Sequence, residues 1–390
     1  MNTNLEISWK SLNKYNEELC GDKVEILKSD DADIVILSDG MGSGVKANIL
    51  ATLTTKILGT MLKGGADISD CVETIAKTLP VCSIRQVAYS TFSILKISKN
   101  GSAYLVEYDN PGCVFMRDGD ILSIPYTFRE VAGKNIREYY FDIQLDDYLI
   151  LFSDGVVHAG VGQKLKFGWG WTGAAEFIRD SLQDMISPSR LTSMICNACE
   201  NYYMNAPGDD TTVAVMKIIE EKIVNLFSGP PASYDDDEVL MADFIQSPGK
   251  KIISGGTSAN IASRILGKKL KASLEYSDPK IPPIATLAGM DLVTEGVLTL
   301  NRLVKILHQY NTGDFTADFY QKLDADNGAA MLAKILLEDC THLNMFVGQA
   351  MNAAHQNEGL PFDLSIRMRL IDSIKLECEK MGKSVTIKYY

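Results

Sequence analysis

The sequence predicts an α+β protein of two domains, in which an N-terminal β-sandwich flanked by helices precedes a smaller α/β domain. Three observations support this fold class. The chain has 390 residues, which suits two domains because a domain typically has about 100–200 residues. Strand-like runs follow one another in the first half, whereas strands and helices alternate in the second. A cluster of glycine, proline and serine residues, followed by an acidic run, lies between the halves.

The first half is expected to form a mainly antiparallel sandwich with helices outside it. Two short apolar runs, Val24–Lys28 and Asp33–Ser38, indicate the strands of one hairpin. The proline-free stretch Ser43–Leu62 ends before Lys63-Gly64-Gly65, which is typical of a helix with a glycine stop. The remaining expected elements are a helix at Ile68–Leu79, strands at Ala88–Ile97, Ala103–Asp109, Cys113–Arg117, Ile121–Ile124, Glu138–Ile143 and Tyr148–Ser153, helices at Thr172–Leu182 and Ser189–Tyr203, and a last strand at Thr211–Ile218.

The second half alternates in a way that favours a parallel or mixed sheet. Lys251–Gly267 is expected to form a strand, a glycine turn and a helix. The other expected elements are strands at Ala272–Tyr276, His342–Val347 and Ser384–Lys388, and helices at Leu292–His308, Asn327–Leu337 and Asp363–Met381. The acidic run Asp235–Glu238 indicates a solvated linker or the start of a helix. We therefore expect one domain over residues 1–222, a linker at about 223–236, and a second domain over 237–390.

Composition and charge narrow the function classes. The chain has 38 basic and 50 acidic residues, a net charge of −12, which argues against binding to nucleic acid or to an anionic membrane surface and suits cation binding. No run of about 18 apolar residues predicts a membrane span, and the first residues do not resemble a secretory signal, so a cytoplasmic protein is expected. The eight cysteines are expected to be reduced core thiols. For Cys196 and Cys199, a zinc site or a redox pair are the alternatives.

Four aspartates share one setting, a strand end or tight turn with glycine beside it. They occur in Gly21-Asp22, Asp39-Gly40, Asp154-Gly155 and Gly208-Asp209. Hard divalent cations prefer carboxylate and carbonyl oxygens, and glycine lets a backbone carbonyl approach an ion. Two such ions close together can activate water and hold a phosphoryl oxygen. A plain turn is the alternative for any single Asp-Gly pair, but four of them in one domain favour a metal site.

The segment SDGMGSG at Ser38–Gly44 resembles the first metal motif of the SpoIIE-like branch of the metal-dependent (protein phosphatase 2C type) Ser/Thr phosphatases. The upstream GD at Gly21-Asp22, FSDGV at Phe152–Val156 and GDDTTV at Gly208–Val213 are similar to the other metal motifs of that family, in the same order. The resemblance covers about residues 15–220. It implies an α-β-β-α sandwich of the phosphatase 2C type and two Mn²⁺ or Mg²⁺ ions that activate water to hydrolyse phosphoserine or phosphothreonine.

The resemblance also implies a role for each matching residue. Asp39 matches the carboxylate that bridges the two ions, and Gly40 offers its carbonyl. Asp22, Asp154 and Asp209 match the other metal ligands, so these aspartates are the expected catalytic and metal-binding residues.

Other residues near these motifs are candidates for further roles at the site. Asp210 is a weaker candidate, which is expected to support the ligand residues and not to bind the ions itself. Asp109 is expected to be a turn residue, with a contact to substrate as the alternative, and Arg85 is expected to have a surface or structural role, with a phosphate contact as the alternative. In the glycine- and tryptophan-rich loop His158–Trp171, the aromatic residues either pack on the sandwich or select the substrate.

The second domain resembles no family with a known activity. In it, the turn Gly255-Gly256-Thr257-Ser258 leads from a strand into a helix, an arrangement that can bind an anionic cofactor or ligand. A plain strand-to-helix turn is the alternative.

The expected function is a protein Ser/Thr phosphatase in bacterial signalling with a C-terminal regulatory domain. A phosphoprotein such as an anti-sigma-factor antagonist is the expected substrate, and the sequence allows a homodimer. The alternatives are a pseudo-phosphatase that only binds partners, and a small-molecule sensor whose C-terminal domain carries the main function.

Overall fold

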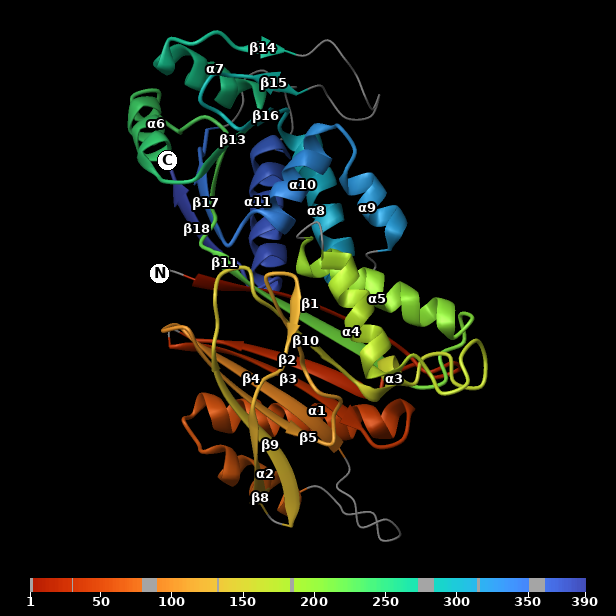
Figure 1. The fold of residues 1–390 in the computed structure, drawn as a ribbon. Helices are drawn as coiled ribbons and strands as arrows, with labels where there is room; N and C mark the ends of the chain where they lie inside the picture. Colours follow the sequence, from red (N-terminus) through yellow and green to blue (C-terminus); the bar gives the residue numbers. More distant parts are fainter. Residues whose placement is uncertain are drawn as a thin grey trace. The chain divides into compact units, whose positions relative to one another are not determined.

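The computed structural model describes residues 3–29, 31–78, 90–131, 133–182, 186–272, 284–313, 316–350 and 362–390. The chain divides into two compact units, which we call unit 1 (Met1–Glu220) and unit 2 (Glu221–Tyr390) (Figure 1). Unit 1 has two sheets and unit 2 has one, and each unit has its own buried clusters.

Unit 1 contains two antiparallel sheets. The five-stranded sheet has the order β1-β11-β10-β6-β7 and the six-stranded sheet has the order β2-β3-β4-β5-β9-β8. The strands are β1 (Thr3–Leu12), β2 (Asp22–Lys28), β3 (Ala32–Gly40), β4 (Ser90–Ser98), β5 (Ser102–Tyr108), β6 (Val114–Arg117), β7 (Asp120–Leu122), β8 (Tyr126–Val131), β9 (Lys134–Asp142), β10 (Tyr148–Phe152) and β11 (Thr211–Glu220). The helices are α1 (Gly44–Lys63), α2 (Ile68–Thr78), α3 (Asp154–Val157), α4 (Gly170–Ser181) and α5 (Pro188–Tyr202).

Strand β3 shows how the layers of unit 1 follow from the sequence. Successive side chains of a strand point to opposite faces of the sheet. Val35 and Leu37 therefore enter the core between the two sheets, whereas Ile34 and Ile36 pack with the helices on the outer face. Helices α1 and α2 cover this outer face (Figure 1), and α4 and α5 cover the outer face of β10 and β11. The result is the α-β-β-α order of layers that the sequence predicts.

Helix α1 carries the apolar spacing that fits it to this face. Ala47, Leu50, Thr54 and Leu58 are buried, and their spacing of three or four residues places them on one side of the helix. The helix ends at Gly64, whose N–H donates to the carbonyl of Thr60. The next residue, Gly65, has φ of +83°, a left-handed conformation that glycine adopts without steric cost and that stops the helix, as the sequence predicts.

Unit 2 is an α/β unit built on a seven-stranded sheet of order β14-β15-β16-β13-β12-β17-β18. The strands from β16 to β18 in this order pair in parallel. The strands are β12 (Ile223–Ser228), β13 (Lys250–Ser254), β14 (Lys271–Ala272), β15 (Ala285–Thr286), β16 (Leu292–Thr294), β17 (His342–Val347) and β18 (Ser384–Tyr389). The helices are α6 (Asp236–Gln246), α7 (Gly256–Leu266), α8 (Val297–Asn311), α9 (Ala317–Leu323), α10 (Gly328–Glu338) and α11 (Phe362–Lys380).

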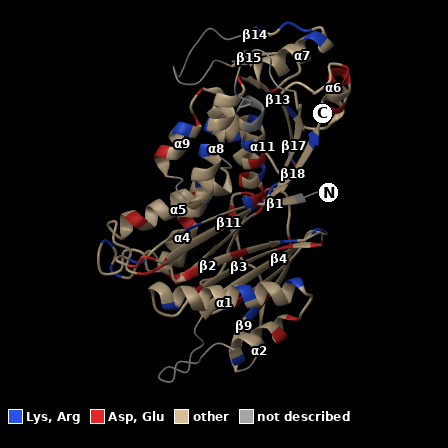
Figure 2. Ribbon diagram, turned by 180° about the vertical axis from the view of Figure 1, so that it is seen from behind, with Lys and Arg blue, Asp and Glu red and all other residues tan. Residues whose placement is uncertain are grey.

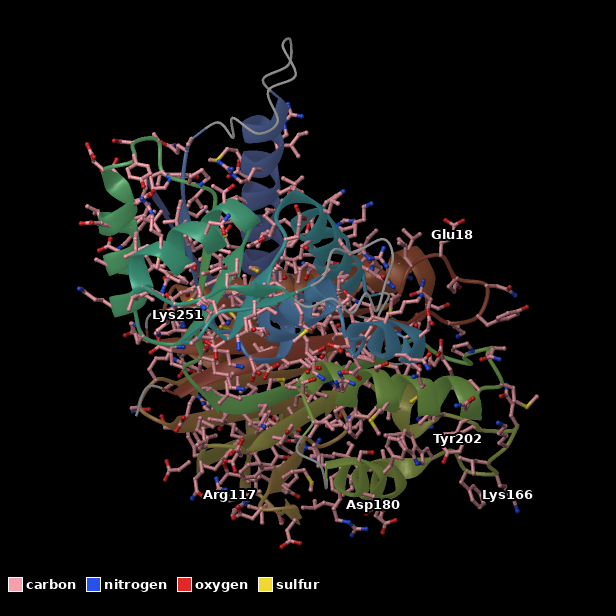
Figure 3. The ribbon with its side chains drawn as sticks, turned by 90° about the horizontal axis from the view of Figure 1, so that it is seen from above. Glu18, Arg117, Lys166, Asp180, Tyr202 and Lys251 are labelled. Carbon is pink, nitrogen blue, oxygen red and sulfur yellow. The ribbon has the colours of Figure 1, made fainter. Side chains whose placement is uncertain are left out.

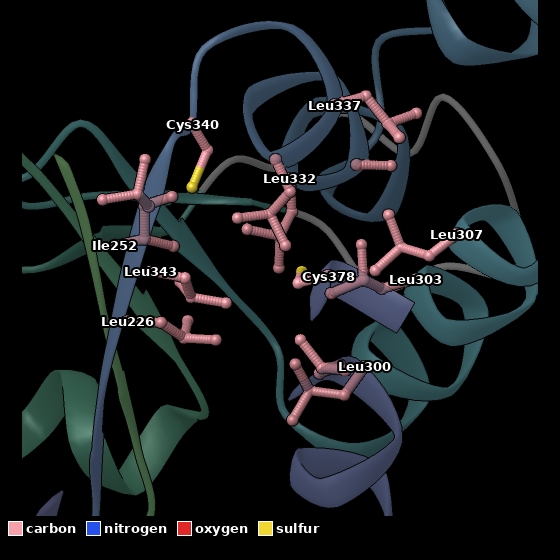
Figure 4. Close-up of a cluster of buried hydrophobic side chains, with 14 of the residues drawn as sticks. Leu226, Ile252, Leu300, Leu303, Leu307, Leu332, Leu337, Cys340, Leu343 and Cys378 are labelled. Atoms are coloured by element: carbon pink, nitrogen blue, oxygen red, sulfur yellow. The ribbon is translucent and has the colours of Figure 1, made fainter. Parts of the chain in front are cut away.

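The core of unit 2 lies on both faces of this sheet. On one face Leu226, Ile252 and Leu343 of the strands point toward Leu300, Leu303 and Leu307 of α8, with Cys378 of α11 between them (Figure 4). On the other face α6 and α7 pack over Phe227 and Ile253. Because helices cover both faces, the strands are apolar on both sides, which is typical of parallel sheets.

Two sequence predictions need correction. Residues 223–236 are not all linker, because β12 lies in the middle of the sheet and Phe227 is fully buried. The helix expected from Leu292 begins at Val297, and Leu292–Thr294 form strand β16 instead. Strands β1 and β8 and helix α9 were not predicted. The expected strand Ala272–Tyr276 lies almost entirely outside the described residues, as does Arg85.

Charged and sulfur-containing residues agree with the sequence analysis. The acidic run starts α6 (Figure 2), where negative charge is favourable at a helix N-terminus. Cys196 and Cys199 are fully buried free thiols of α5. Burial raises the pKa of Cys196 to about 12 and that of Cys199 well above its usual value, so both are inert core thiols. No helix within the described ranges is long and apolar enough to cross a bilayer.

Candidate metal centre

Asp22 and Asp39 are held opposite each other by two paired strands. Asp22 is the first residue of β2 and pairs directly with Asp39 near the end of β3. Directly opposed residues of an antiparallel pair have their side chains on the same face. Asp22 is buried, and the N–H of Gly40 donates to the carbonyl of Gly21 over 3.1 Å. The hairpin that the sequence predicts thus brings two carboxylates side by side.

The other aspartates come from the second sheet. Asp154 follows the end of β10 and begins the short helix α3. Asp209 and Asp210 directly precede β11, which pairs with β10. Ser153 and Thr212 tie these ends together, because the N–H of Thr212 donates to Ser153 Oγ over 2.9 Å and the N–H of Ser153 donates to the carbonyl of Thr212 over 3.0 Å.

One hydrogen bond and one close glycine contact join the two sheets at this point, and a second glycine contact joins the ends of β10 and β11 within one sheet. Ser153 Oγ donates to Asp22 Oδ2 over 2.7 Å. A Cβ added to Gly21 would lie 2.8 Å from Asp210 Oδ2, and one added to Gly155 would lie 2.1 Å from the carbonyl oxygen of Asp210. Glycine is therefore required for the close approach of these turns, and the structure brings all the aspartate motifs to one edge of the sandwich.

Burial and mutual repulsion dominate the electrostatics of this cluster. Burial raises the pKa of Asp39 strongly, and the neighbouring charges of Asp22, Asp154 and Asp209 raise it further. Burial likewise raises the pKa of Asp22, against the lowering effect of the hydroxyl of Ser153. The pKa of Asp209 is also raised, first by burial and then by Asp154. Carboxylates in such a setting favour either bound protons or a cation.

The donor set fits a divalent cation. Within the described part of the chain, Asp22 Oδ1, Asp154 Oδ1 and Asp210 Oδ2 are buried carboxylate oxygens that lack a hydrogen-bond partner. Carboxylate oxygens of this kind are the ligands that Mg²⁺ and Mn²⁺ prefer. The described side chains do not form a ready-made cage of three or more His, Cys, Asp or Glu groups, so the fit rests on these buried, partnerless oxygens.

The structure places three further residues at this cluster, namely Asp210, Ser153 and Lys14. Asp210 Oδ1 accepts from the backbone N–H of Lys14 over 3.0 Å, which leaves Oδ2 directed at Gly21. The Nζ of Lys14 lies 3.9 Å from Asp209 Oδ1. Ser153 could have been singled out from its place inside FSDGV, but its bond to Asp22 depends on a residue far away in the sequence. Lys14 has no sequence signal at all.

Asp109 and its neighbour Asn110 have separate roles. Asp109 is exposed and has φ of +51°, a left-handed conformation that aspartate tolerates in turns, so the turn role holds. Asn110 is buried, and its Oδ1 accepts from Thr91 Oγ1 over 2.6 Å. Thr91 pairs with Asp39 across β3 and β4. Asn110 thus supports the strand beside Asp39, a contact that the sequence analysis missed.

Most of the aromatic residues of the loop after α3 pack against other residues of unit 1. The ring of Trp169 lies 5.2 Å from that of Tyr202 and 5.3 Å from that of Phe177. Trp171 Nε1 donates to the carbonyl of Gly112 over 2.7 Å. Phe167 differs, because it is 82% exposed. Its neighbour Lys166 lies at the same end of unit 1 as Tyr202 (Figure 3).

In unit 2, the predicted anion-binding turn Gly255–Ser258 is partly exposed and partly buried. Ser258 is buried, and its Oγ accepts from the N–H of Gly229 over 2.8 Å. Gly256 and Thr257 are exposed, and Gly255 is half-buried.

Comparison with known proteins gives one family match. Residues 29–219 match the family model for stage II sporulation protein E (SpoIIE). No curated protein matches the chain.

Several solved structures are similar to part of the chain. The PP2C phosphatase domain of SpoIIE from Bacillus subtilis, solved with a fragment of its regulatory domain, is 17% identical; the alignment covers 55% of this chain and 63% of that chain, with a TM-score of 0.46. The RsbU and RsbW domains of a Mycobacterium tuberculosis protein are 14% identical, with 62% and 68% covered and a TM-score of 0.46. RsbX in complex with magnesium is 19% identical, with 55% and 95% covered and a TM-score of 0.40. This chain thus spans 63% of the length of the first of these chains.

Proposed function

Residues 29–219 are a SpoIIE/PP2C-type phosphatase domain, and from this premise we propose that the chain is a metal-dependent phosphatase that hydrolyses phosphoserine and phosphothreonine in proteins. The family match supports the reaction class. The single observation that carries the proposal is the meeting of the four aspartate motifs, with buried carboxylate oxygens that lack partners.

The proposed metal ligands are the carboxylates of Asp22, Asp39, Asp154 and Asp209 and the carbonyl of Gly40, with Asp210 as an additional ligand or support. When bound, two Mn²⁺ or Mg²⁺ ions would supply Lewis acidity that lowers the pKa of water and offsets the charge of the phosphoryl oxygens.

The residues of the chain itself position and orient these groups. Ser153 holds Oδ2 of Asp22 and thereby leaves Oδ1 as the oxygen available for a cation. The strand pairing keeps Asp39 opposite Asp22. The same burial that raises the pKa of both carboxylates favours a cation over water as their partner. No serine or cysteine nucleophile is needed in this proposal.

The proposed substrate is a phosphoprotein, and by the family resemblance an anti-sigma-factor antagonist is the first to test. The cytoplasmic setting expected from the sequence belongs to the same proposal.

The test is hydrolysis of phosphoserine and phosphothreonine peptides by the full chain, with Mn²⁺ or Mg²⁺ and after chelation. Release of phosphate that chelation stops and added metal restores is the expected result. Peptide binding without any release of phosphate, in the presence of either metal, would instead identify a pseudo-phosphatase and overturn the proposal.

A further inference from the structure

The parallel strands of unit 2 have the order of a doubly wound sheet. In space they run β16-β13-β12-β17-β18, so the chain starts in the middle and winds outward in both directions. Helices α6 and α7 lie on one face, and α8, α10 and α11 lie on the other. In such doubly wound sheets, ligands bind outside the carboxyl ends of the strands. The carboxyl ends of these strands are therefore the expected ligand-binding edge of unit 2.

Two helices begin side by side at this edge, and neither has a side-chain cap. Gly255 is the N-cap of α7 and Gly296 is the N-cap of α8. The two turns are adjacent, because the N–H of Gly255 donates to the carbonyl of Thr294 over 2.9 Å and a Cβ added to Gly296 would lie 3.4 Å from the Cα of Gly255. The first backbone N–H groups of a helix have no partner within the helix, and its dipole attracts negative charge.

A second, independent observation is a pair of buried hydroxyls at the same edge. Thr299 lies in the first turn of α8, is 1% exposed, and its Oγ1 has no hydrogen-bond partner among the described residues. Ser228, the last residue of β12, is equally buried, and the structure gives its Oγ no partner either. A buried polar group without a hydrogen-bond partner destabilises the folded state, so a ligand that meets these hydroxyls would relieve that cost.

Strand register places these hydroxyls in one row. Ser228 pairs with Ser254, and Ser254 pairs with Thr294, so the three side chains lie on the same face of neighbouring strands. Ser254 Oγ and Thr294 Oγ1 both donate to the carbonyl of Glu295. Ser228 is the member of the row whose hydroxyl stays available. The row faces α8, since Leu226 and Ile252, two residues earlier on β12 and β13, pack in the same cluster as Leu300 of α8.

The carboxylate of Glu295 narrows the chemistry of the ligand. Its Oε2 is buried and has no hydrogen-bond partner within the described ranges, and it lies directly before Gly296. A carboxylate accepts hydrogen bonds from hydroxyl groups, whereas the uncapped helix starts bind an anion. A ligand that satisfies both carries a phosphate and free hydroxyls in one small molecule.

We propose that this edge of unit 2, formed by Gly255–Thr257, Glu295, Gly296, Thr299 and Ser228, binds a phosphorylated small molecule with free hydroxyls, that is, a nucleotide or a sugar phosphate. The phosphate lies over the starts of α7 and α8, and the hydroxyls meet Glu295. Ser258 does not bind the ligand; it holds the loop after β12 against α7 through Gly229. This inference is independent of the phosphatase activity of unit 1.

A matched pair of variants tests the anion site. Gly256 is exposed and has open space where a Cβ would lie, with no heavy atom within 4 Å. Gly256→Asp places a negative charge at the start of α7, whereas Gly256→Ala adds the same Cβ without charge. Binding of adenosine monophosphate, ribose 5-phosphate and inorganic phosphate to the full chain is measured by isothermal titration calorimetry with chelator present, so that phosphate is not held by metal in unit 1.

The expected result is binding of at least one phosphorylated compound, nearly unchanged in Gly256→Ala and weakened by ~10-fold or more in Gly256→Asp, given the usual strength of charges at a helix start. The Asp39→Asn chain should give the same isotherm as the unchanged chain. Binding by the nucleotide alone or by both organic phosphates identifies the source. Equal affinity in Gly256→Asp and Gly256→Ala, or no binding of any of the three compounds, would overturn the proposal.

Thr299→Val provides a second test with a different readout. The change removes the hydroxyl but keeps the shape of the side chain, and the hydroxyl has no hydrogen bond to lose in the described structure. The melting temperature should hold or rise while the ligand affinity falls several-fold. A lower melting temperature with unchanged affinity would contradict the assignment of this hydroxyl to the ligand.

Discussion

Asp39 faces Asp22 across two paired strands and lies within the field of Asp154 and Asp209. Replacing it by asparagine keeps the shape of the side chain and removes the charge that is proposed to hold two cations. We predict that Asp39→Asn lowers phosphatase activity by roughly 10²–10³-fold, the usual cost of losing one key electrostatic contact. In the absence of metal the same change should raise the melting temperature, because a buried repulsion is relieved.

Steady-state rates on a phosphopeptide and thermal melts in chelator check this prediction. Asp118→Asn is a suitable control, since Asp118 lies in the turn between β6 and β7 and should leave both quantities unchanged. Activity like that of the unchanged protein in Asp39→Asn would exclude Asp39 as the bridging ligand.

The raised pKa values of Asp22, Asp39 and Asp209 predict how stability depends on pH without metal. An unfolded aspartate loses its proton near pH ~3.9, whereas the folded cluster keeps its protons to higher pH. The folded state therefore binds more protons, and the free energy of unfolding falls as the pH rises through the folded pKa values. The stabilisation that these three aspartates contribute is fully present only below the pKa of the unfolded aspartate.

Thermal melts in chelator from about pH 5 to about pH 9 should show this loss of stability, with a shallower slope in Asp39→Asn. Added Mn²⁺ or Mg²⁺ should restore stability most at the high end of the range, because the cation then replaces the lost protons. Parallel slopes in the two proteins would show that the cluster does not control the pH dependence.

At the scale of elements, the contact between α3 and the start of β11 determines whether the carboxylates meet. A Cβ at Gly155 would lie 2.1 Å from the carbonyl oxygen of Asp210 and 2.4 Å from Thr211 Oγ1. We predict that Gly155→Ala separates Asp154 from Asp209 and Asp210. The expected cost is about 1–3 kcal/mol of stability, as for other overpacked sites, with loss of metal-dependent activity.

Gly208→Ala is the matched control for this prediction. Gly208 also stands beside an aspartate of the cluster, but its nearest contact from an added Cβ would be 3.5 Å, to the ring of Tyr203. Chemical denaturation and phosphatase assays should therefore show a clear loss in Gly155→Ala and little change in Gly208→Ala. Similar behaviour of both variants would mean that close packing at Gly155 does not organise the site.

The local patterns of strands and turns explain what the sequence could and could not predict. The aspartate motifs were predictable because each combines an apolar strand, a carboxylate and a glycine within a few residues. Strand β8 was missed because most of its residues are exposed and polar or aromatic, so it lacks a clear alternation. The sequence predicts a linker at strand β12 because Gly229-Pro230-Pro231 follows it directly. These residues form the turn after a central strand, in which Asn225 is buried and donates to the carbonyl of Pro248 over 2.6 Å.

Long-range contacts lie beyond such reasoning. The bond from Ser153 to Asp22 joins residues 131 positions apart, and the approach of Asp210 to Gly21 depends on how two sheets pack. Local patterns predict which residues lie at strand ends, but not which strand ends meet.

For the whole molecule, the division at Glu220 predicts that unit 1 folds alone. The first and last strands of unit 1 pair along their entire length, with Thr3 opposite Glu220, so residues of unit 1 alone complete this sheet. The next residues belong to unit 2, because the N–H of Lys222 donates to Thr341 Oγ1 over 2.8 Å. A fragment of residues 1–220 therefore keeps both sheets, all four aspartate motifs and their buried clusters. It should be soluble, melt in one cooperative transition and retain metal-dependent phosphatase activity, as measured by calorimetry and peptide hydrolysis.

A fragment ending at residue 215 is the control, since it removes pairing from β1 and should be less stable. If the 1–220 fragment aggregates or exposes apolar surface while the full chain does not, the two units share a core and the boundary is wrong.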